Sequence, residues 1–143
     1  MKTIAKKLTV IVTMCAIVLS MVAPTSVYAA NKPVPAKVTI TSKSYNKSKN
    51  SVNLKWKKAK NASRYIIYVK QSNAKKWTKL ATVSNKKTSY TYKSSSKYKL
   101  KKGNTYYFRM RAYNTKSKTY GKYSKSVKVN IATGVHTHKW VEK

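Results

Sequence analysis

Acidic side chains are almost absent from this sequence. Its 143 residues contain a single carboxylate side chain, Glu142, and no aspartate, against 33 lysines and arginines. Catalysis by carboxylate acids and bases, and calcium binding by a cage of carboxylates, therefore lack their usual groups. The formal net charge is +32, so we expect the partner to be an anion. A compositional bias of the genome would explain many of the lysines, but it would not explain the loss of nearly every acid.

Cysteine, glycine and histidine are scarce too. The single Cys15 excludes an internal disulfide, and the isolated glycines exclude a glycine-rich phosphate loop. A Ser-His-Asp triad lacks its aspartate, whereas a Ser-Lys dyad stays open, because nothing distinguishes one such pair from another. His136 and His138 lack the third ligand that a metal site needs. We therefore predict a protein that is not an enzyme and holds neither cofactor nor metal.

The N-terminal residues have the pattern of a secretory signal peptide. Three early lysines precede an apolar run over residues 8–23, and small residues end the segment at Ala29. The run is shorter than the roughly 20 residues of a membrane-spanning helix, although a membrane anchor remains the alternative. We predict a signal peptide over residues 1–29 and a secreted, extracellular chain without cysteine. Such a chain looks bacterial, and its retention at a cell wall would be electrostatic.

The rest of the chain breaks into short alternating runs between clusters of Ser, Asn, Lys and Thr, which is typical of an all-β sandwich. We predict seven antiparallel strands, over residues 36–41, 51–57, 64–70, 77–83, 88–92, 105–113 and 124–131. The predicted organisation is a linker at 30–35, one domain at 36–131 and a flexible C-terminal tail at 132–143.

Several motifs together resemble the fibronectin type III family. They are VNLKW at 52–56, YIIYV at 65–69, LKKG at 100–103, YYFRMRAYN at 106–114 and YSKSVKV at 123–129. The resemblance implies an immunoglobulin-like sandwich with Trp56 in its core and Tyr65 at the start of the third strand. It also implies a tyrosine corner formed by Leu100 and Tyr106. Lys102 replaces the proline that the family usually has there, and without aspartate the chain has no integrin-binding motif.

Alternation divides the strand at 105–113 into two rows. Tyr106, Phe108, Met110 and Ala112 form the row predicted to face the core, and Tyr107, Arg109, Arg111 and Tyr113 form the outward row. In the family the third strand neighbours the sixth, which implies that Ile66, Tyr68 and Lys70 join the outward row, with Trp77 and Tyr120 near its edge.

This outward row is the candidate ligand face. Guanidinium groups bind phosphate, sulfate or carboxylate through two parallel hydrogen bonds, and aromatic rings stack on sugars or bases. The predicted residues are Ile66, Tyr68, Lys70, Tyr107, Arg109, Arg111 and Tyr113. The alternative is an ordinary exposed sheet surface, since Tyr, Ile and Arg suit a pleated surface without any ligand.

Lysines spread over nearly every predicted loop favour a binding or adhesion module for linear polyanions. For a secreted monomer these would be teichoic-type polymers or acidic glycans. Nucleic acid ranks lower, and an anionic membrane surface is a further candidate. Two other functions stay open. One is a cationic antimicrobial protein, although no amphipathic helix is present to enter lipid. The other is a spacer module from a larger extracellular enzyme or adhesin, suggested by the tail sequence HTHKW at 136–140.

Overall fold

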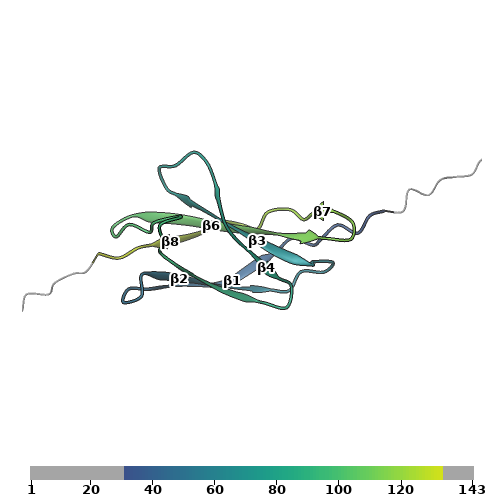
Figure 1. Cartoon of the computed structure of the whole chain (residues 1–143), viewed down its shortest axis with the longest axis horizontal. Coiled ribbons are helices and arrows are strands. Elements are labelled where there is room, and N and C mark those ends of the chain that lie inside the picture. The colour runs from purple at the N-terminus through teal and green to yellow at the C-terminus, as the bar shows by residue number, and fades with distance from the viewer. Residues whose placement is uncertain (1–30, 134–143) are drawn as a thin grey trace, which may run out of the picture. The chain divides into compact units, whose positions relative to one another are not determined.

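The computed structural model describes residues 31–133, which form two packed antiparallel sheets (Figure 1). The predicted all-β sandwich is thereby confirmed. The strands are β1 (Thr39–Asn46), β2 (Ser51–Lys57), β3 (Arg64–Gln71), β4 (Thr78–Ser84), β5 (Ser89–Lys93), β6 (Thr105–Asn114), β7 (Thr119–Tyr120) and β8 (Val127–Asn130). Within this part of the chain no helix is long and apolar enough to cross a membrane.

One sheet has three strands in the order β1-β2-β5. The other has five, in which β6 lies between β3 and the two short strands β7 and β8, and β4 forms the far edge. The described chain starts at one end of the sandwich and finishes at the other (Figure 1). Residues 1–30 and 134–143, which include the whole predicted signal peptide and most of the predicted tail, lie outside the described residues.

Two predicted strands differ from those observed. The first was expected at 36–41 but runs from Thr39 to Asn46, where most side chains are exposed on both faces of an edge strand and leave no alternation to read. The last was expected at 124–131, but β8 covers only Val127–Asn130, and the two-residue strand β7 (Thr119–Tyr120) was not predicted. The chain between them, residues 121–126, forms no regular strand.

The core lies between the sheets and is formed by alternate residues of β2, β3 and β6. Tyr106, Phe108, Met110 and Ala112 are buried, as the alternation predicted, with at most 1% of each exposed. Trp56 packs its ring edge to face against Tyr65, with centroids 5.5 Å apart. Aromatic pairs in this geometry add a little stability beyond the area they bury.

The predicted tyrosine corner is present before β6. The hydroxyl of Tyr106 accepts a hydrogen bond from the backbone N–H of Lys101 at 2.9 Å and donates one to the carbonyl of Lys99 at 3.3 Å. Leu100 is buried between them. Gly103 has a φ of 79°, a value that glycine adopts without strain, and its N–H donates to the carbonyl of Ile131 at 2.7 Å. The turn is thus fixed without proline at Lys102.

Residues just before the predicted domain boundary also pack on the sandwich. The carbonyl of Pro33 accepts hydrogen bonds from the hydroxyls of Ser117 and Thr119, at 2.8 and 3.0 Å. Pro35 is buried. The segment assigned to a linker at 30–35 therefore contains residues that the sandwich holds in place.

Candidate functional site

Arginine and aromatic side chains alternate on the outer surface of the five-stranded sheet. The order is Trp77, Arg109, Tyr123, Arg111 and Tyr120, and we call these five residues the arginine ladder. The guanidinium carbon of Arg109 lies 4.2 Å from the ring centroid of Trp77 and 3.8 Å from that of Tyr123. That of Arg111 lies 3.9 Å from Tyr120 and 4.8 Å from Tyr123. Both arginines are therefore stacked between two rings.

The backbone of β6 sets the spacing of the two arginines. Arg109 and Arg111 are alternate residues of one strand, so both project from the same face. In a strand such residues are about 6.6 Å apart, which leaves room for one ring between their guanidinium groups. Tyr123 fills that space. Trp77, immediately before β4, covers the far side of Arg109.

An irregular segment after β7 brings Tyr120 and Tyr123 to the same face. The N–H of Gly121 donates to the carbonyl of Ala112 at 2.9 Å, and the N–H of Ser124 donates to the carbonyl of Met110 at 2.7 Å. Three residue steps on this segment therefore match two steps on β6, which is the geometry of a β-bulge. In a regular strand, residues three apart face opposite sides of the sheet. The extra residue removes that difference, and the two rings enclose Arg111.

Glycine is needed at position 121 for a steric reason. A Cβ atom there would lie 2.6 Å from the carbonyl oxygen of Pro35 and 3.2 Å from that of Ala36. These contacts are with backbone atoms, which cannot move aside as a flexible side chain can. The bulge and the N-terminal segment are thus packed against each other at Gly121.

The two guanidinium groups of the ladder carry positive charges that are partly buried. Arg109 and Arg111 are each half-buried, and the Nε atom of each is buried without a hydrogen-bond partner among the described residues. No acidic side chain lies between residues 31 and 133 to neutralise them. Aromatic faces attract cations and lower the cost of holding the guanidinium groups close together.

Tyr68 of β3 supports the ladder from the neighbouring strand. Its ring packs edge to face on Tyr123, with centroids 5.6 Å apart, and lies 5.8 Å from the guanidinium of Arg111. Burial raises the pKa of the Tyr68 phenol above its ordinary value of 10.0, although the neighbouring Arg111 acts in the opposite direction. The phenol consequently stays neutral at physiological pH.

The structure brings most residues of the predicted ligand face together around the arginine ladder. Tyr113 stacks on Tyr120 with centroids 4.6 Å apart, and Lys70 extends the ladder at 5.6 Å from the Trp77 ring. Tyr107 is half-buried and lies opposite Lys70 in the sheet. Ile66 lies opposite Arg111 and therefore on the same outer face of the sheet, but it is only 7% exposed because its neighbours cover it, which leaves little of it for a ligand to contact.

The two arginines were expected side by side on an exposed face, but they are half-buried between aromatic rings. Aromatic rings cover the flat faces of both guanidinium groups, which leaves an incoming anion to meet their edges. Tyr123, the central ring of the ladder, was not part of the predicted face. The spacing of Tyr120, Gly121 and Tyr123 was the available signal, because a glycine within a strand often marks a bulge.

Two packed antiparallel sheets that do not close into a barrel place the chain among the immunoglobulin-like β-sandwiches. The tyrosine corner is a further feature of this class of fold. No family model matches the sequence, and no curated protein matches it. Solved structures, in contrast, do match the chain. A fibronectin III-like protein from Clostridium thermocellum matches with a TM-score of 0.53 and 25% identity over 66% of this chain and 90% of its own.

Two animal structures agree with this match. The first three fibronectin domains of chicken CNTN1 give a TM-score of 0.55 at 22% identity, over 71% of this chain and 33% of that one. The fifth fibronectin domain of Drosophila Lar gives 0.53 at 16%, over 70% and 99%. The chain has the fibronectin type III fold. Domains of this kind are generally non-catalytic modules and are often extracellular.

Proposed function

We propose that this chain is a secreted, non-catalytic module that attaches to linear anionic polymers, either teichoic-type polymers of a cell envelope or acidic glycans. The observation that carries the proposal is the arginine ladder, which holds two guanidinium groups on a surface to which residues 31–133 contribute no acidic side chain. The arginines would be the points of closest contact, and the surrounding lysines would supply a longer-range attraction.

The geometry of the ladder suits a polymer with regularly spaced charges. Arg109 and Arg111 project from alternate positions of β6, about 6.6 Å apart along the strand. Rings on both sides restrict the rotation of each guanidinium, so less side-chain entropy is lost when an anion binds. Two charges on neighbouring units of one polymer would therefore meet two groups that are already oriented.

The lysines add affinity with little demand on sequence or structure. They are exposed on strands and turns of both sheets, including Lys55 and Lys57 of β2 and the pairs Lys75-Lys76 and Lys86-Lys87. Neutralising a polyanion with such a surface releases condensed counterions, which makes affinity fall steeply as salt rises. Nucleic acid would meet the same chemistry. The signal-like pattern of residues 1–29 favours envelope polymers and glycans instead.

Binding to isolated Gram-positive cell walls tests the proposal. The chain from Asn31 onward is incubated with walls before and after their anionic polymers have been extracted, at about 50 and 500 mM salt. We expect binding at low salt that is lost on extraction and strongly reduced at high salt. Binding that survives both treatments would refute attachment through charge and would point to an uncharged wall component.

A spacer is the second candidate function, favoured by where the described chain begins and ends. Those two points lie at opposite ends of the sandwich, so successive domains could follow in line (Figure 1). The matching CNTN1 structure holds three fibronectin domains in one chain. A spacer would show no wall binding that depends on the anionic polymers, whereas the polyanion-binding module would lose its wall binding when those polymers are extracted.

A further inference from the structure

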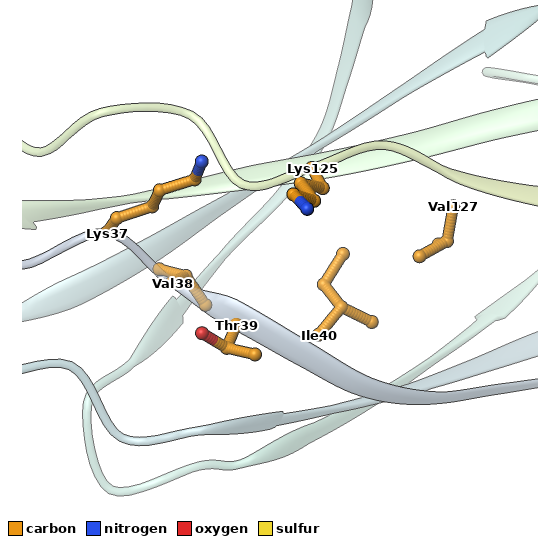
Figure 2. A pocket seen from close by; sticks show the side chains of 6 residues that line it. All are labelled: Lys37, Val38, Thr39, Ile40, Lys125 and Val127. Atoms are coloured by element: carbon orange, nitrogen blue, oxygen red, sulfur yellow. The ribbon is translucent and has the colours of Figure 1, made fainter.

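A groove lies between the two sheets, along the seam where the edges of β1 and β8 meet. A cavity of about 340 Å³ is lined by Lys37, Val38, Thr39, Ile40, Lys125 and Val127 (Figure 2). A second hollow shares Ile40 and Val127 with it and continues along β1 as far as Lys43. The two hollows therefore form one groove that follows the seam.

The chemistry of this groove is that of an apolar floor with a cationic rim. The half-buried Ile40 and Val127 supply the accessible floor above Val38, which is almost fully buried, and their side chains approach each other from opposite sides of the gap (Figure 2). The exposed lysines Lys37 and Lys125 flank one end. No acidic side chain of residues 31–133 competes for these ammonium groups.

Features of β1 argue against another β-strand as the occupant. The pairing register of β1 with β2 shifts between Ile40 and Ser42, which interrupts the regular edge that an added strand needs. Lys43 stands opposite the buried Leu54, so it belongs to the inward-facing row, but it is exposed and places its charge at the mouth of the groove. Bulges and inward-pointing lysines are known to prevent strands from pairing at a sheet edge.

A second copy of the chain is an equally poor occupant. Two molecules of this charge would repel each other, and the lysines at the groove have no acidic partner on the described surface of another copy. A ligand that complements this groove would have an apolar chain, to lie on the floor, and one negative charge at its end, to meet the ammonium groups.

We propose that the groove binds a monomeric alkyl carboxylate of medium length, with its chain on Ile40 and Val127, above the buried Val38, and its carboxylate between Lys37 and Lys125. Burial of the alkyl chain supplies the larger part of the affinity, and the lysines fix the direction in which the chain lies. This site is independent of the arginine ladder, which lies on the outer face of the five-stranded sheet rather than in the seam.

Titration with sodium decanoate, followed by methyl NMR, tests the proposal. Decanoate is kept below its micelle concentration, with 1-decanol as the uncharged probe and acetate as the short anion. We expect saturable shifts of the Val38, Ile40 and Val127 methyl signals with decanoate, weaker ones with decanol and none with acetate. Shifts spread over the whole core, or their absence, would overturn the site.

Two variants separate the charged and apolar contributions. Replacing Lys37 and Lys125 with glutamine should weaken decanoate binding by about fivefold, since each partly exposed ion pair contributes little, and leave decanol binding unchanged. The matched control replaces Lys86 and Lys87, which are exposed in the β4–β5 turn, and should change neither. Val127→Thr, which keeps the shape of the side chain, should weaken both alkyl probes. Equal affinities for decanoate in all these proteins would contradict the proposal.

Discussion

The guanidinium carbon of Arg109 lies 3.8 Å from the ring centroid of Tyr123, although Tyr123 belongs to none of the regular strands. The contact exists because the segment after β7 gains one residue relative to β6 while its backbone remains bonded to Ala112 and Met110. A local irregularity of the backbone thus arranges the cations of the outer surface.

Replacing both ladder arginines with lysine should weaken polyanion binding without changing the net charge. Lysine presents a compact ammonium in place of a planar fork, so it loses both the stacking and the paired hydrogen bonds. We expect a loss of stability of about 0.5 to 2 kcal/mol per arginine, and reduced wall binding at low salt. Urea unfolding and wall pull-down measure the two effects.

Arg64→Lys is the matched control for the ladder variant. Arg64 is the remaining arginine of the described chain, it is exposed, and no ladder ring stacks on it. Its replacement should alter neither stability nor wall binding measurably. If the double ladder variant binds walls as strongly as Arg64→Lys does, diffuse lysine charge alone accounts for the attachment.

Gly121→Ala should destabilise the domain by roughly 1 to 3 kcal/mol, which is the usual cost of overpacking. The added methyl would lie 2.6 Å from the carbonyl oxygen of Pro35, so the N-terminal segment or the bulge has to shift. The same substitution in a chain that begins at Lys37, without that segment, should cost much less. Equal costs in the two backgrounds, measured by urea unfolding, would show that the clash with Pro35 is not the cause.

Phe108→Ala tests the core directly beneath the ladder. The ring is fully buried, and its removal should cost about 3 to 5 kcal/mol in the free energy of unfolding. Tyr107→Ala, at the next position of β6 and on the opposite face, should cost clearly less because that side chain is only half-buried. Similar losses at both positions would contradict the assigned faces of the strand.

Alternation in the sequence was sufficient to predict the faces of β2 and β6, because each of these strands buries one face fully and leaves the other at least partly accessible. The same alternation predicted that Arg109 and Arg111 lie on the outer face of the sheet. The contacts of Tyr123 could not be predicted in that way, since a bulge changes which residues share a face. The limits of β1 were also missed, because an edge strand such as Thr39–Asn46 is mostly exposed and its residues look like a loop.

Added salt should stabilise the fold through simple screening. The described chain carries only basic charges on its side chains, so folding brings like charges together, and low ionic strength increases their repulsion. We expect the melting temperature to rise between about 10 and 300 mM sodium chloride, where the screening length falls severalfold. A melting temperature that falls over this range would show that attractive charge contacts dominate.

Alkaline pH should reveal the burial of Tyr90. Burial is the main cause that raises the pKa of its phenol above 10.0 in the folded protein, and the nearby Tyr92 acts in the same direction. As the pH rises past 10, the unfolded chain loses this proton first, so the free energy of unfolding decreases. This contribution of Tyr90 to the free energy of unfolding is fully present below about pH 10 and is lost above it.

Tyr90→Phe cannot ionise, so its stability should decline less than that of the unmodified protein between about pH 9 and pH 11. Urea unfolding of both proteins across this range measures the difference directly, and the lysines, which titrate in both proteins alike, cancel from the comparison. Parallel curves would mean that Tyr90 ionises as easily in the fold as in the unfolded chain.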